Sequence, residues 1–119
     1  METKICRIRK VYRIIQEFEQ EFEKEYNMSL NEGMLLCILS KMGSASSGHL
    51  ANELGLTCSN TSKVIKSVEK KGFIRRVLGK EDKRQMYFTL SEEGKARMEK
   101  IKCSEMEIPE VLMGDMPLL

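Results

Sequence analysis

The chain of 119 residues is 41% hydrophobic and 32% charged with a formal net charge of +2, a composition typical of one soluble globular domain. No apolar run approaches the ~20 residues that span a bilayer, and the first ten residues lack the apolar segment of a secretory signal, so we expect a cytoplasmic protein without a membrane partner. One histidine, four widely spaced cysteines and the lack of a nucleophile–histidine–acid set or glycine-rich phosphate loop argue against a metal site, a cofactor and an enzyme.

The first predicted element is a long helix. Apolar side chains recur at intervals of mostly three and four residues from Ile8 to Tyr26. About 24 residues of helix make a rod of roughly 36 Å, which is long for so small a domain. The glutamates between the apolar positions form a solvated face. Because the apolar stripe is longer than one small domain readily covers, we expect part of it to contact a second subunit.

A second helix opens at Ser29, where Glu32 three residues later completes a capping-box pattern. The apolar run MLLCILSKM is its buried body, with Cys37 as a small buried thiol, and Gly43 ends it. The stretch GSASS that follows is predicted to be a short polar loop whose serines cap the next helix.

Residues 50 to 70 have the spacing of a helix-turn-helix. A short helix with Leu50, Ala51 and Leu54 on its inner face ends at Gly55. After a turn of about three residues that contains this glycine, a second helix begins, capped by the hydroxyl of residue 57 or 59.

The second of these helices has two contrasting sides. At about 100° per residue, an apolar side lies opposite a polar and basic one. The apolar side comprises Thr61, Val64, Ile65 and Val68, and the other comprises Ser59, Lys63, Lys66 and Lys70. A merely solvated face often alternates charge sign for pairing four residues apart, whereas this face has no acid. It is therefore suited to contact the phosphates and base edges of DNA.

A β-hairpin follows Gly72, with FIRRVL and QMYFTL as strands and GKEDKR as the polar, basic turn. Ser91 caps a last helix from about 92 to 107, with Ala96 and Ile101 among its apolar positions, until Pro109 stops it.

The small net charge hides an uneven distribution. Residues 58 to 84 contain nine lysines and arginines and three acids, a net charge of +6, so the rest of the chain carries −4 of the total of +2. A basic block beside an acidic remainder indicates a polyanionic partner at one face.

A helix-turn-helix followed by a two-stranded basic hairpin is a winged helix, so we predict a mainly α fold with a small β-hairpin wing. The runs HLANELGLTCSNTSKVIKSVEKKGFIRR and EDKRQMYFTLSEEG resemble the MarR family of bacterial transcriptional regulators. Val68 stands where this family usually has leucine, and Ser91 where it has threonine. The matching positions are Leu50, Ala51, Leu54, Ser59, Ser62, Ile65, Glu69, Gly72, Ile74, Arg76, Asp82, Arg84, Leu90 and Gly94.

The resemblance implies a homodimer that places two recognition helices in successive major grooves and two wings in the flanking minor grooves. It also implies a small-molecule effector pocket, and it makes Arg84 the wing-tip arginine that Asp82 orients. We expect a single domain over 1–119, with 44–91 as the DNA-binding core and 1–28 and 92–119 as helical dimerisation extensions. The chain departs from the family in its C-terminal part, because only 28 residues follow Ser91.

We therefore expect a sequence-specific DNA-binding transcriptional regulator that binds a palindromic operator in double-stranded DNA as a homodimer. The alternative is a winged-helix protein-interaction module without specific DNA binding, whose outward helix face should be more apolar. One of Arg75 and Arg76 is expected to face phosphate while the other pairs with an acid, and Cys58 is either a passive thiol or an oxidant sensor in the first turn of the recognition helix. The residues expected to contact DNA are Ser59, Asn60, Thr61, Lys63, Lys66, Lys70, Arg76, Lys83 and Arg84.

Overall fold

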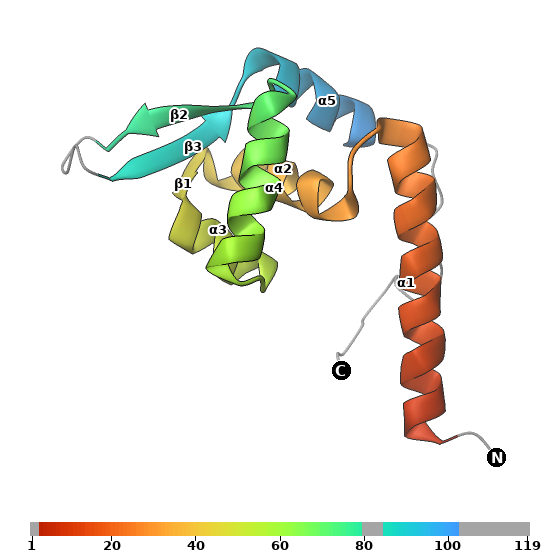
Figure 1. Ribbon diagram of the computed structural model, residues 1–119. Helices are drawn as coiled ribbons and strands as arrows, with labels where there is room; N and C mark the ends of the chain where they lie inside the picture. Colours follow the sequence, from red (N-terminus) through yellow and green to blue (C-terminus); the bar gives the residue numbers. More distant parts are fainter. Residues whose placement is uncertain (1–2, 80–84, 103–119) are drawn as a thin grey trace. The chain divides into compact units, whose positions relative to one another are not determined.

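The computed structural model describes residues 3–79 and 85–102 (Figure 1). The chain divides into two compact units, one containing the first helix and the other running from Leu30 to Ser104. No helix in the described part is long and apolar enough to cross a membrane. The elements are α1 (Lys4–Tyr26), α2 (Leu30–Met42), β1 (Ser44–Ser46), α3 (Ser47–Leu54), α4 (Cys58–Lys70), β2 (Ile74–Leu78), β3 (Met86–Leu90) and α5 (Glu92–Lys102).

The long first helix is confirmed, with 23 residues. Thr3 caps its start, because the Thr3 hydroxyl accepts a hydrogen bond from the Cys6 N–H at 3.1 Å. Asn27 ends it in the left-handed region at φ 54°, a conformation that asparagine tolerates better than most residues.

The apolar stripe of α1 changes in character along the helix. In the C-terminal half, Phe22 and Tyr26 are buried and their rings pack with centroids 4.8 Å apart. In the N-terminal half, the side chains of Ile5, Ile8 and Tyr12 are 78%, 67% and 64% exposed. The N-terminal half of the stripe thus presents an open apolar surface.

The second unit has its core between α2, α3 and α4. Leu35, Leu36 and Leu39 of α2 are almost fully buried, as are Leu50 of α3 and Val68 of α4. Burial of such side chains contributes about 1.5–3 kcal/mol each, so this three-helix contact is a main source of the unit's stability. The helix-turn-helix predicted for residues 50 to 70 is confirmed, and Gly55 closes α3 in the left-handed conformation at φ 68°.

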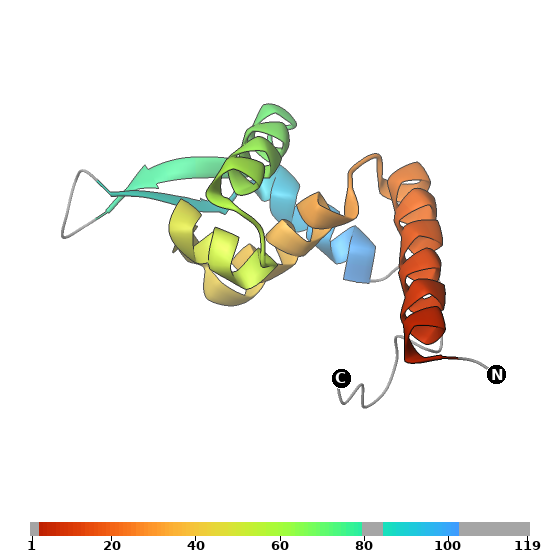
Figure 2. The same ribbon diagram turned by 60° about the horizontal axis from the view of Figure 1, so that its bottom comes forward.

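The predicted hairpin is present as β2 and β3, which we call the wing and which project from the helical body in both views (Figures 1 and 2). The prediction of a loop for GSASS is wrong, because Ser44–Ser46 forms a third strand, and the sheet order is β1-β3-β2. The strand forms because Ala45 pairs with Phe88 and is buried on the core face, and because the Thr89 hydroxyl donates to the Gly43 carbonyl at 2.7 Å. Ser46 does cap α3, as expected for one of these serines.

Helix α5 begins where predicted, and the Ser91 hydroxyl accepts a hydrogen bond from the Gly94 N–H at 3.0 Å. A Cβ on Gly94 would lie 2.0 Å from the Phe73 carbonyl oxygen, so only glycine permits this close approach between α5 and the start of β2. Ala96, expected at an apolar position, is exposed instead, while Met98 faces the core. The predicted continuation to residue 107 and the stop at Pro109 lie outside the described residues.

Candidate nucleic-acid interface

The capping of α4 determines which side chains can face outward at its start. Thr57 is the N-cap, because its hydroxyl accepts a hydrogen bond from the Asn60 N–H at 3.0 Å. Of residues 57 and 59, the two candidates for this cap, Thr57 is therefore the one that caps α4. The Ser59 and Asn60 side chains lie exposed in the first turn, the part of a recognition helix that usually meets base edges.

The two sides of α4 differ as the sequence predicts. Ile65 and Val68 are 3% and 0% exposed and face the core. On the opposite side Lys63, Lys66 and Lys70 are exposed, and no acid within residues 3–79 and 85–102 forms an ion pair with them. Together with Ser59 and Asn60 these lysines make a continuous polar and basic surface, here called the basic face. The basic face has no exposed large apolar side chain, which argues against the protein-interaction alternative.

Thr61 does not belong to the basic face. Its side chain is 1% exposed, and its hydroxyl donates to the Thr57 carbonyl at 2.8 Å. The inclusion of Thr61 among the DNA contacts is therefore corrected: it lies on the inner side of α4, as its position in the apolar pattern already indicates.

Arg76 is the wing arginine that pairs with an acid. Its Nε and Nη2 atoms donate to the two carboxylate oxygens of Glu69 on α4, at 2.6 and 3.0 Å, and its guanidinium lies over the Phe88 ring at 5.6 Å. These hydrogen bonds from Arg76 lower the pKa of the Glu69 carboxyl below its usual 4.5 against the opposing effect of burial, and the Arg76 charge adds to the lowering. The same pair raises the pKa of Arg76.

The expectation that Arg76 contacts DNA stays a prediction. The Glu69 carboxylate already occupies two donors of the Arg76 guanidinium and would compete with a phosphate for it. Arg75, on the other face of β2, is exposed and has no ion pair within the described residues, so it is the better placed of the two to meet a phosphate. Lys83 and Arg84 lie outside the described residues, as does Asp82.

A second ion pair on α4 was not foreseen from the sequence. Glu32 of α2, expected only as a capping residue, is 6% exposed, and its carboxylate accepts hydrogen bonds from Ser67 and Lys71. The distances are 2.9 Å from the Ser67 hydroxyl and 2.9 and 3.2 Å from the Lys71 ammonium. A sequence signal for this contact exists: Ser67 and Lys71 are four residues apart at the C-terminal end of α4, and Glu32 is the one acidic residue in α2.

Three of the four cysteines lie in the described ranges. Cys6, Cys37 and Cys58 are free thiols, and Cys58 is exposed in the first turn of α4. Cys37 was expected to be buried and is half-buried instead. Within the described ranges no group of three or more potential ligands is positioned to hold a metal ion. Cys103 lies outside these ranges.

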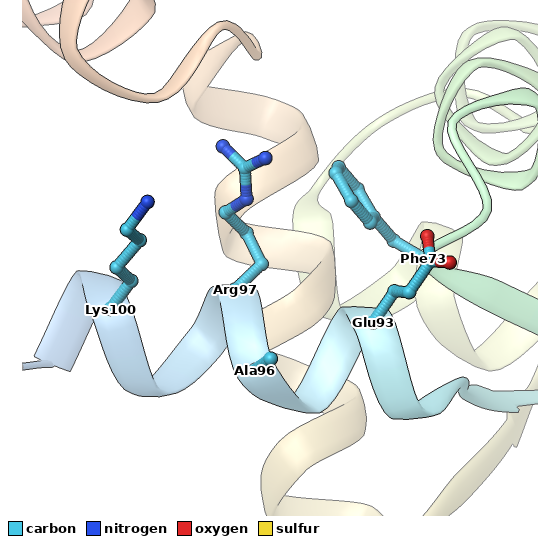
Figure 3. Close-up of a pocket in the computed structure, with 5 residues that line it drawn as sticks. All are labelled: Phe73, Glu93, Ala96, Arg97 and Lys100. Atoms are coloured by element: carbon cyan, nitrogen blue, oxygen red, sulfur yellow. The ribbon is translucent and has the colours of Figure 1, made fainter.

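An open pocket lies on the surface of the second unit. It has a volume of about 370 Å³ and is lined by residues of α5 and by Phe73 (Figure 3). The Arg97 guanidinium lies over the Phe73 ring at 5.1 Å, and Lys100 and Glu93 bring charges of both signs to the lining. This mixed lining distinguishes the pocket from the basic face of α4, which carries no acid.

The chain is similar to known regulators in sequence and in fold. The family model described as "MarR family" matches residues 28–86. An uncharacterized HTH-type transcriptional regulator of Bacillus subtilis, YfiV, is 30% identical over 69 residues, which cover 58% of this chain and 43% of that protein. The chain thus spans less than half the length of this curated relative.

Two solved structures illustrate the likeness in fold. AbsC from Streptomyces coelicolor, a MarR family transcriptional regulator, superposes with a TM-score of 0.71 at 23% identity, covering 86% of this chain and 72% of AbsC. A mutant of MarR from E. coli in complex with operator DNA superposes with a TM-score of 0.70 at 17% identity, covering 83% of this chain and 76% of that protein. At these identities the superpositions establish the winged-helix fold.

Proposed function

We propose that this chain, whose residues 28–86 match the model of the MarR family, is a sequence-specific DNA-binding transcriptional regulator. The observation that carries the proposal is the basic face of α4. Lys63, Lys66 and Lys70 form one exposed surface without a neutralising acid in the described part of the chain. Three uncompensated lysines on one helix face repel each other unless a polyanion lies against them, and DNA supplies one phosphate charge per ~1.7 Å of duplex axis.

The roles within the basic face follow from position along α4. Ser59, Asn60 and Lys63, in the first turns, are assigned to base edges in the major groove, and Lys66 and Lys70 to phosphates. A MarR mutant of similar fold was crystallised with operator DNA, which supports DNA as the partner of the basic face.

A salt titration tests the proposal directly. The full chain is titrated with duplexes from upstream of its own operon and with a random duplex of equal length, at several salt concentrations. We expect tighter binding to one upstream duplex and a steep loss of affinity with salt for both, because binding releases counterions from the phosphates. Binding that ignores salt, or a complete lack of binding at low salt, contradicts the proposal.

We also propose that the regulator acts as a two-fold dimer built from both chain ends. The exposed apolar half of α1, with Ile5, Ile8 and Tyr12, supplies a surface that a second copy can cover. Half-sites are then about 34 Å apart along the duplex. Truncation after Glu107 should weaken dimerisation and DNA binding together, whereas a monomer at high protein concentration with intact cognate binding contradicts the dimer.

For the small-molecule effector that the family resemblance implies, we propose the pocket between Phe73 and α5 as the binding place. Its volume of about 370 Å³ falls within the ~300–1,000 Å³ of typical ligand pockets. A fragment screen followed by NMR should shift the resonances of Phe73 and Ala96, and Arg97→Ala should abolish those shifts. Fragments that shift only other regions contradict this placement.

A further inference from the structure

The recognition helix α4 is held by an ion pair on each side of its basic face. On one side, Ser67 and Lys71 hydrogen-bond the buried Glu32 carboxylate of α2. On the other side, Glu69 accepts two hydrogen bonds from Arg76 of β2. At about 100° per residue these two attachments lie about 180° apart around the helix axis, with the basic face between them and the core opposite.

We propose that these two ion pairs fix the rotation of α4 about its own axis and thereby set which base edges the basic face can reach. Glu32 and Arg76 are then positioning residues, because both act through α4. The inference rests on the proposed DNA-binding function and assigns the residues that give it sequence specificity.

The core contact constrains this rotation only through the shapes of the packed side chains. Ile65 and Val68 pack through apolar contact, which has no directional preference beyond shape. Charge-assisted hydrogen bonds are directional and short, as the Arg76–Glu69 distances of 2.6 and 3.0 Å are. Because the attachments lie on opposite sides, a roll of α4 in either direction stretches one of them.

The geometry of a helix shows why a small roll matters. Side-chain tips lie about 5–6 Å from the helix axis, so a roll of about 20° displaces them by about 2 Å. A hydrogen bond to a base edge is lost over that distance, whereas attraction to phosphate changes little. Loss of an ion pair should therefore lower the affinity for the cognate site and leave the affinity for random DNA nearly unchanged.

The test compares the ratio of cognate to random affinity among variants of the full chain. Glu32→Gln keeps the side-chain size but removes the charge that pairs with Lys71, and we expect the ratio to fall about tenfold, as for one misplaced base contact. Ser67→Ala, which removes one of the hydrogen bonds to Glu32, should lower the ratio in the same direction and serves if Glu32→Gln does not fold. Met98→Ala, a core change on α5, is the stability control and should leave the ratio unchanged.

The charges of the pair formed by Glu69 and Arg76 can also be exchanged. A recovery of the affinity ratio in the exchanged variant would not be explained by a merely structural role of these residues. Glu69→Arg and Arg76→Glu, made singly, should each lower the ratio, and the double swap should restore it to within about twofold of the original, because its net charge and its ion pair are both preserved. A double swap that stays as poor as the single changes overturns the inference, as does an equal loss on cognate and random DNA in Glu32→Gln. Failure of the proposed function looks different, since the unmodified chain would then show no cognate preference at all.

Discussion

Helix α4 buries one side and leaves the other open, whereas α1 buries the C-terminal half of its apolar stripe and leaves the N-terminal half open. The two open surfaces differ in chemistry. The open side of α4 carries Lys63, Lys66 and Lys70, while the N-terminal half of α1 leaves Ile8 and Tyr12 67% and 64% exposed. An ordinary surface helix presents mixed charges that pair along its length, as Arg13 and Glu17 do on another side of α1, with 3.5 Å between the Arg13 Nε and a Glu17 carboxylate oxygen.

The difference between the two helices indicates two different partners. An uncompensated basic face is stabilised by a polyanion, and an exposed apolar stripe by another apolar protein surface. A regulator that binds DNA as a dimer uses both kinds of surface at once. Changes at α1 should therefore alter assembly, and changes at α4 should alter DNA recognition.

The largest effect is expected at α1. Ile8→Asp places a charge in the middle of the exposed stripe, so we expect the proposed dimer to dissociate in sedimentation velocity. DNA affinity should fall about 100-fold, because the second half-site is no longer bound by a linked subunit. Gln20→Asp adds the same charge on another side of α1 and should change neither property. A dimer that survives Ile8→Asp would remove α1 from the interface.

The next effect separates two lysines of α4. Lys63→Ala should cost about 1–3 kcal/mol on the cognate site and relax its sequence preference. Lys70→Ala should weaken cognate and random duplexes about equally and reduce the dependence of affinity on salt, because it removes a phosphate contact. Fluorescence anisotropy with both duplexes measures the two changes, and equal behaviour of the two variants would contradict the division of roles.

A smaller effect is expected from Arg84, which lies outside the described residues and stays a prediction from the sequence. A narrow A·T-rich minor groove concentrates negative potential and attracts an arginine. Arg84→Ala should thus lose about 1 kcal/mol on sites with A·T-rich flanks and little on sites with G·C flanks. If replacing the flanks affects the original chain and the variant alike, the wing does not read the groove.

The smallest effect concerns stability against pH. The pKa of Glu69 is lowered in the folded state, so its contribution to the free energy of unfolding is complete above the usual 4.5 and is lost as the pH falls through the lower folded value. The melting temperature of the original chain should exceed that of Glu69→Gln at neutral pH by no more than a few degrees, and the gap should close below pH 4.5. A gap that persists in acid would show that the charge of Glu69 is not its cause.

Local patterns in the sequence predict the helices, the helix-turn-helix and the two sides of α4 because each depends on spacing within one element. Leu50 and Val68 follow helical periodicity, and both are buried as expected. The third strand was missed because three residues give no periodicity, and Ser44–Ser46 becomes a strand only through its pairing with β3.

Only part of the candidate site could likewise be predicted from the sequence. Its exposed lysines follow from the helical pattern of α4 alone. The partners of Arg76 and Glu32 depend on contacts between elements that are 7 and 35 or more residues apart in sequence, which a pattern within one element cannot specify. For Thr61 the residue type alone does not decide between a DNA contact and a buried position. Its hydroxyl can hydrogen-bond the backbone of its own helix and remain buried on the apolar side.

The central place of β3 in the sheet has a consequence for the entropic cost of the proposed DNA binding. An isolated two-stranded hairpin is at best marginally stable in water, whereas β3 is paired along both edges, with β1 and with β2. The base of the wing is consequently ordered before the proposed binding of DNA, and the conformational entropy of arranging it is lost during folding. Association then requires little further ordering at this point, so a greater part of the contact energy remains available for affinity.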